Sequence, residues 1–174
     1  MSERFEYFEK HPETPAFKAE DIHANFQPRD IPTAEKEPLK EGEPLNKGAW
    51  VEKGMQDVPV YKIDISDSPV KGVDDFKKVP HSEMVRGFHT LETEVHPAVE
   101  KGARNDDFRA MDQRRGLEYP QGSQKIYESF YGQDAIRLEK MGDSYKVING
   151  YHRLYVANEL KIPTVPARVI EKQQ

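Results

Sequence analysis

The chain of 174 residues contains no cysteine. Disulfide bonds, thiol catalysis and cysteine-ligated zinc or iron–sulfur sites are therefore excluded. The chain also lacks a run of about 18 apolar residues, so no segment is expected to cross a membrane. Its first residues lack the apolar stretch of a secretory signal peptide. We expect a cytoplasmic protein, or a secreted effector delivered without a conventional signal peptide.

Excess positive charge is absent as well. The net charge is −5, and residues 1–57 carry all of it, with 8 Lys and Arg against 13 Asp and Glu. Residues 58–174 hold 18 of each kind. General nucleic-acid binders are basic, so this balance argues against that class, although local basic patches stay open.

Residues 1–57 show no sustained apolar period. Six of the 13 prolines fall here, at Pro12, Pro15, Pro28, Pro32, Pro38 and Pro44. Each proline removes a backbone donor and biases the preceding residue away from helix. We predict an irregular, acidic arm or linker over 1–57, with aromatic anchors at Phe5, Tyr7, Phe17 and Phe26, followed by a domain over 58–174. The arm is also where a protein partner, such as an immunity protein or delivery machinery, could bind.

The first half of the predicted domain holds one strand and three helices. Alternating β-branched residues predict a strand over 58–65. Apolar residues at helical spacing predict a helix over 82–101, which Pro97 should break or kink. Shorter helices are expected over 105–116 and 123–131.

The C-terminal part is the most informative. It reads as a strand over 135–140, a turn at Gly142-Asp143, a strand over 145–148, a helix over 151–160 and a strand over 164–170. Together with the preceding elements, this order predicts an α+β fold, in which helices flank a small mixed β-sheet and the N-terminal arm stays irregular.

Asn149-Gly-Tyr-His-Arg153 lies where the helix over 151–160 begins. The first backbone N–H groups of a helix have no partner within it, and the helix dipole is positive there. Asn149 and Gly150 allow a ligand to approach the backbone closely. His152 can donate to a phosphate or carry a proton, and Arg153 can clamp phosphate oxygens. Alternatively, Arg153 pairs with a carboxylate and His152 is a surface residue.

The ordered series from Tyr145-Lys-Val-Ile-Asn-Gly-Tyr-His-Arg to Val165-Pro-Ala-Arg-Val-Ile170 resembles the ParB/sulfiredoxin superfamily. The resemblance covers about residues 134–170. Two departures limit what it implies. Tyr151 stands where sulfiredoxin needs its cysteine, which excludes sulfinate reduction. The helix-turn-helix domain of chromosome-partitioning ParB proteins is missing after the last strand, so we expect no centromere-binding role.

The resemblance implies nucleotide or phosphate handling. The expected ligand is ATP or another nucleotide with Mg²⁺, or the phosphate of a nucleic acid, and the expected reaction is phosphoryl transfer or hydrolysis of a nucleotide or phosphodiester. The implied phosphate-binding residues are Asn149, Gly150, Tyr151, His152, Arg153 and Lys71, and the implied catalytic residues are His152, Arg153 and Asp67. Asp67 and Lys71 enter because the loop after the first strand borders the active site in this superfamily.

Two other functions stay open. One is a non-catalytic, nucleotide-dependent module that regulates or binds DNA or protein, and the other is a toxin or effector domain. The mixed-charge helix over 105–115 is either a solvated face or a second polar site. In the second case Arg104, Arg109, Arg114 or Arg115 would lie beside the ligand, and Asp106, Asp107 and Asp112 would be metal-ligand candidates. His81, His89 and His96 do not have the spacing of a metal site, and no metal ligand is assigned.

Overall fold

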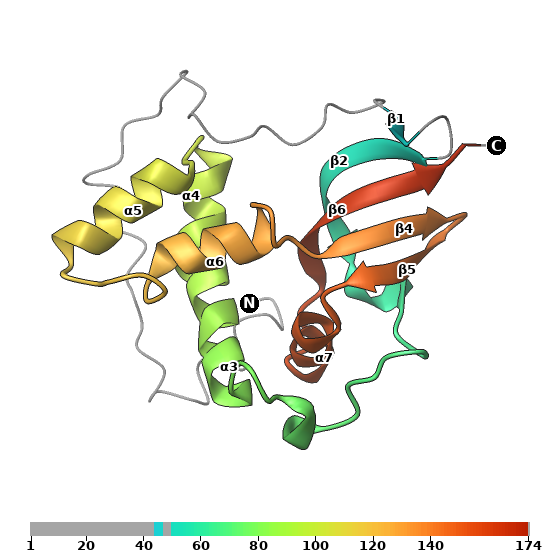
Figure 1. The fold of residues 1–174 in the computed structure, drawn as a ribbon, viewed down its shortest axis with the longest axis horizontal. Helices are drawn as coiled ribbons and strands as arrows, with labels where there is room; N and C mark the ends of the chain where they lie inside the picture. The colour runs from blue at the N-terminus through green and yellow to red at the C-terminus, as the bar shows by residue number, and fades with distance from the viewer. Residues whose placement is uncertain (1–43, 47–49, 174) are drawn as a thin grey trace.

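A computed structural model describes residues 44–46 and 50–173 (Figure 1). One six-stranded mixed sheet runs in the order β1-β2-β6-β4-β5-β3. The pairs β3/β5 and β4/β6 are parallel, and the other neighbours are antiparallel. The strands are β1 (Pro44–Asn46), β2 (Trp50–Pro59), β3 (Ile63–Asp64), β4 (Arg137–Met141), β5 (Ser144–Asn149) and β6 (Thr164–Lys172).

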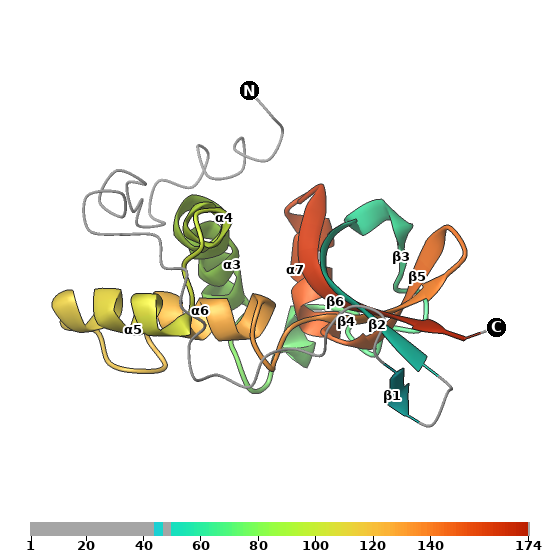
Figure 2. The same cartoon turned by 90° about the horizontal axis from the view of Figure 1, so that it is seen from above.

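Of the five α-helices in the described residues, four gather on one side of the molecule, and the last, α7, lies between them and the sheet (Figures 1 and 2). This arrangement confirms the predicted α+β class with a small mixed sheet flanked by helices. The helices are α3 (His81–Thr90), α4 (His96–Glu100), α5 (Asn105–Arg114), α6 (Ser123–Phe130) and α7 (Tyr151–Glu159), and the short helical turns are η1 (Val60–Lys62), η2 (Val73–Asp75) and η3 (Leu91–Val95).

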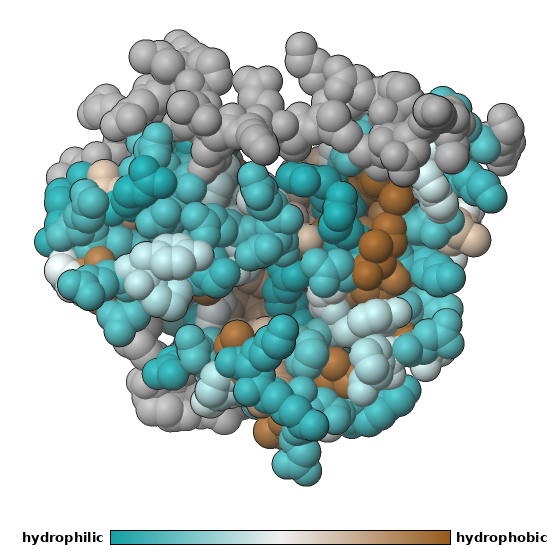
Figure 3. All heavy atoms as spheres, viewed as in Figure 1, coloured by the Kyte–Doolittle hydropathy of each residue, from teal (hydrophilic) through white to brown (hydrophobic). Residues whose placement is uncertain are grey.

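The hydrophobic core joins the two halves of the molecule. Helix α7 contributes Leu154 and Val156, the sheet contributes Leu138 and Val165, and Phe88 of α3 is also fully buried. The coloured part of the face in Figure 3 is mostly hydrophilic, and an apolar strip lies over the strands. None of the helices in 44–46 and 50–173 is long and apolar enough to cross a membrane.

Pro97 does not end the helix in which it lies. The chain stays helical from α3 through η3 into α4, and η3 is a π-helical turn in which the His96 N–H donates to the Leu91 carbonyl, five residues back. Pro97 lacks the N–H that a regular α-helical ladder needs. The wider turn just before it shifts the ladder by one residue, which accommodates the proline at the start of α4.

The first long strand differs from its prediction. Strand β2 begins at Trp50 and ends at Pro59, where the chain turns through η1 before β3. The predicted boundary between 57 and 58 therefore falls inside β2, which pairs with β6 along its whole length. Pro59 has no N–H for a longer ladder, and the chain leaves β6 here and arches to the opposite edge of the sheet (Figure 2). Residues 1–43 and 47–49 of the predicted arm, with its aromatic anchors, lie outside the described residues.

The other predicted elements are present with small changes of boundary. Helices α5 and α6 bury Phe108, Met111 and Tyr127 against each other and the core. Gly142 adopts a positive φ of 62° in the predicted turn between β4 and β5. The β5–α7–β6 series therefore places residues 149–153 at the turn that connects β5 to α7.

Candidate functional site

The turn from β5 into α7 depends on Gly150. Its φ of 110° lies in the left-handed region, and a Cβ atom built there would lie 2.9 Å from Cγ1 of the buried Ile136. A side chain at this position would be strained and would collide with Ile136. Gly150 therefore lets the strand turn sharply into the helix while the backbone packs against the core.

The first turn of α7 has no side-chain cap. Its first helical hydrogen bond joins the Leu154 N–H to the Gly150 carbonyl at 3.0 Å. Within the described residues, the N–H groups of Tyr151, His152 and Arg153 make no hydrogen bond. Three donors thus remain at the positive end of the helix.

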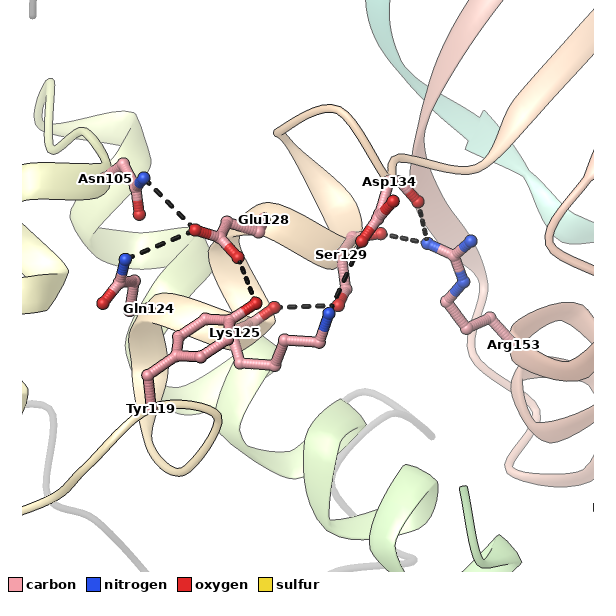
Figure 4. A network of polar contacts seen from close by, with 8 residues as sticks. All are labelled: Asn105, Tyr119, Gln124, Lys125, Glu128, Ser129, Asp134 and Arg153. Carbon is pink, nitrogen blue, oxygen red and sulfur yellow. Dashed lines mark hydrogen bonds and ion pairs between the residues drawn. The ribbon is translucent and has the colours of Figure 1, made fainter. Parts of the chain in front are cut away.

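Arg153 points away from solvent, toward the end of α6 (Figure 4). Its Nη1 donates to the carbonyl of Ser129 and, at 2.6 Å, to the carbonyl of Asp134. Its guanidinium carbon lies 5.8 Å from the centre of the Phe130 ring. Burial lowers the pKa of Arg153 to about 10, and the nearby Asp134 charge acts in the opposite direction. The carboxylate of Asp134 is near enough to act on Arg153 through its charge, but the hydrogen bonds of the guanidinium go to backbone carbonyls.

Arg153 belongs to a polar network that extends into the group formed by α3, α4, α5 and α6, which we call the helical half (Figure 4). Lys125 pairs with the carboxylate of Asp134 at 3.4 Å. One turn further along α6, Glu128 accepts hydrogen bonds from Asn105, Gln124 and Tyr119. The hydrogen bond from the Tyr119 hydroxyl to Glu128 is the main reason that the pKa of Tyr119 is raised. Arg153 therefore ties α7 to the connection between α6 and β4. Its Nη2 and Nε make no hydrogen bond within the described residues.

His152 is exposed, and its ring is held from one side by the loop over residues 71–76. Nε2 of His152 lies 3.1 Å from the backbone carbonyl of Asp75. The ring of Phe76 meets the His152 ring edge-on, with centroids 5.0 Å apart. Asp75 and Phe76 are thus neighbours of the predicted site that the sequence did not single out.

The 71–76 loop is anchored to both α3 and α7. Phe76 also packs edge-on against His81 at 5.2 Å and Tyr155 at 5.6 Å. His81, the first residue of α3, pairs through Nε2 with Glu159 of α7 at 2.5 Å. The local signal for this docking is a single aromatic residue in the loop, but its partners lie about 5 and 80 residues away along the chain.

Asp67 and Lys71 lie in this connection but not against the turn. Both are exposed, and Nζ of Lys71 reaches back to the Ser66 carbonyl at 3.5 Å. No hydrogen bond or ion pair joins either side chain to 149–153 in the part of the chain that the structure describes. The loop after the first strand does reach the turn, but through Asp75 and Phe76.

The Asp75 carboxylate gives the loop a testable pH dependence. Hydrogen bonds from the backbone N–H groups of Lys71 and then Gly72 lower its pKa. Such a group stabilises the fold above its unfolded-state pKa of about 3.9, and the stabilisation is lost as the pH falls through the lower folded-state value. We expect the amide NMR signals of Lys71 and Gly72 to shift together below pH of about 4. A midpoint above the ordinary value would contradict these contacts.

The aspartates of α5 make their hydrogen bonds and ion pairs within the helical half. Asp107 accepts from the Arg104 N–H, and Asp112 accepts from the N–H groups of Ser123 and Gln124 at the start of α6. Asp106 pairs with Arg109 on the surface. The metal-ligand alternative for these aspartates is not supported, because no three His, Asp or Glu side chains within 44–46 and 50–173 gather as metal ligands. The carboxylates of Asp107 and Asp112 accept backbone N–H groups at the starts of helices instead.

A fully buried glutamate lies beside α5. Glu94, in η3, is fully buried and accepts hydrogen bonds from Arg115 and from the Ser123 hydroxyl. Arg115 is thereby directed into the helical half. Arg104 and Arg109 make their side-chain hydrogen bonds within or next to α5.

Comparison with known proteins adds little. No protein-family model matches the chain, and no curated protein matches it either. Among solved structures, a sulfiredoxin from Arabidopsis thaliana is similar in fold, with 13% identity over 66% of this chain and 82% of that chain and a TM-score of 0.30. The assignment to the α+β class rests on the sheet and helices described above.

Proposed function

We propose that the protein binds a phosphate group, as carried by a nucleotide or nucleic acid, at the first turn of α7. The observation that carries the proposal is the uncapped turn after Gly150, where three N–H donors and an exposed His152 share one short segment. A phosphate at such a place receives several hydrogen bonds and the favourable helix dipole.

The described residues fit phosphate better than a bare metal ion. The donors of this turn are N–H groups, which do not coordinate a cation. Any Mg²⁺ would have to arrive on the phosphate oxygens of the ligand, since no cluster of carboxylates for it exists among the described residues. The role of Arg153 follows from its contacts. It holds the turn against the helical half.

Thermal shift with pyrophosphate, with ATP and Mg²⁺, and with a short oligonucleotide tests the proposal. We expect at least one of them to raise the free energy of unfolding, by about 2.7 kcal/mol at 100 times its dissociation constant. The three ligands share phosphate chemistry, so their ranking separates a phosphate site from one that also reads a base. No shift with any of the three would contradict the proposal.

A pair of matched substitutions locates the site. His152→Glu adds a carboxylate beside the turn, and Asn158→Glu adds the same charge at an exposed position near the other end of α7. A carboxylate a few ångströms from a phosphate repels it by roughly 1 kcal/mol or more, so we expect about a tenfold loss of affinity for His152→Glu. Asn158→Glu should bind like the original chain. Equal affinities for both variants would place the ligand elsewhere.

Product analysis on the same samples separates the enzyme from the non-catalytic module. If His152 moves a proton during phosphoryl transfer or hydrolysis, His152→Ala should lower turnover more than binding. If His152 only donates to phosphate, the two should fall together. Binding without any product would favour the regulatory alternative.

A further inference from the structure

The 71–76 loop is built around one carboxylate. Oδ2 of Asp75 accepts the backbone N–H of Lys71 at 2.7 Å and that of Gly72 at 3.1 Å. The Asp75 N–H in turn donates to the Gly72 carbonyl at 3.1 Å. These three bonds close a tight turn that fixes the direction of the Asp75 carbonyl.

That carbonyl defines which nitrogen of His152 carries a hydrogen. A backbone carbonyl can only accept, so Nε2 of His152, 3.1 Å away, must be the donor. The neutral ring then has its lone pair on Nδ1. The edge-on contact with Phe76 holds the plane of the ring, so both its tautomer and its orientation are determined by the loop.

We propose that Asp75 is a positioning residue for His152, which fixes the Nε2–H tautomer and the orientation of the ring without touching the ligand. The part that concerns phosphate rests on the proposed function, whereas the tautomer does not. With its side chain bound to Lys71 and Gly72 and its carbonyl bound to His152, Asp75 plays the part that a second residue plays behind many functional imidazoles.

The test is the nitrogen NMR spectrum of His152 in the full chain, at pH of about 8, where an ordinary imidazole is neutral. We expect the Nε2–H pattern in the original protein. Asp75→Ala should shift His152 toward a mixture of tautomers, because the loop no longer holds the carbonyl. Asp74→Ala removes the same charge at an exposed neighbour, whose side chain makes no hydrogen bond within the described residues, and should leave the pattern unchanged.

Asp75→Asn guards against a trivial loss of folding. Its amide oxygen can still accept from the two N–H groups, so it should restore the Nε2–H pattern in part. Thermal melts of all variants check that the fold persists. The same tautomer in Asp75→Ala and Asp74→Ala, with both proteins folded, would overturn the proposal.

Pyrophosphate affinity provides the second measurement. Asp75→Ala should weaken binding by about three- to tenfold, the worth of one ordinary hydrogen bond, and Asp74→Ala should not. If the original chain binds no phosphate at all, the proposed function fails while the tautomer result still decides the role of Asp75. An unchanged affinity in an Asp75→Ala protein whose tautomer has shifted would overturn the link between this loop and the ligand.

Discussion

Replacing Arg153 with alanine is expected to lower the free energy of unfolding by about 2–4 kcal/mol, before any effect on a ligand. The guanidinium makes charge-assisted hydrogen bonds to the carbonyls of Ser129 and Asp134 and stacks near Phe130. A hydrogen bond to a charged group contributes roughly 1.5–3 kcal/mol, and a cation over an aromatic ring adds about 0.5–1 kcal/mol. Chemical denaturation of both proteins measures the difference.

Two variants control this experiment. Arg153→Lys keeps the charge but loses the planar fork, so it should recover only part of the stability. Arg109→Ala removes an arginine whose side chain is half exposed and pairs with Asp106 on the surface, and its effect should stay within about 0.5 kcal/mol. An Arg153→Ala protein that melts like the original would mean that the side chain is free in solution and available to the ligand alone.

This expectation reverses the one that sequence reasoning favours for a site arginine, and the reason is geometric. The sequence correctly predicts a helix that begins near Tyr151, and in the structure Leu154, Val156, Ala157 and Leu160 are buried. It cannot show that α7 lies between the sheet and the helical half, because that requires the positions of Ser129 and Asp134. Arg153 belongs to the same short segment as the candidate donors, yet its partners come from α6 and from the connection between α6 and β4.

The same limit applies to the sheet. Alternation over 58–65 predicts a strand, but the pairing that starts β2 at Trp50 comes from β6, more than 100 residues later. Glu52 illustrates the difficulty. The sequence predicts that Glu52 belongs to the acidic arm, whereas its side chain is buried on β2. Burial raises the pKa of Glu52, and the positive charges of Arg168 and Arg137 oppose that rise. Charged residues are rarely buried, so composition points the wrong way here.

Truncating Leu154 should be the most destabilising of the substitutions considered. Its side chain is completely buried in the core that joins α7 to the sheet, and Leu→Ala changes at such positions cost about 2–5 kcal/mol. Leu154→Met keeps the volume and should cost less than about 1.5 kcal/mol. The midpoints of thermal or chemical denaturation give the comparison.

Leu154 and Arg153 together test the position of α7. Successive helical residues point about 100° apart, so one residue can face the core while the next faces the connection between α6 and β4. Both Leu154→Ala and Arg153→Ala should therefore destabilise, whereas Asn158→Ala, at an exposed position of the same helix, should change stability by less than about 0.5 kcal/mol. If Leu154→Ala stays stable while Arg153→Ala unfolds, the helix is rotated. The side chain of His152 would then no longer lie at the surface beside the 71–76 loop, and the phosphate site would have to be abandoned.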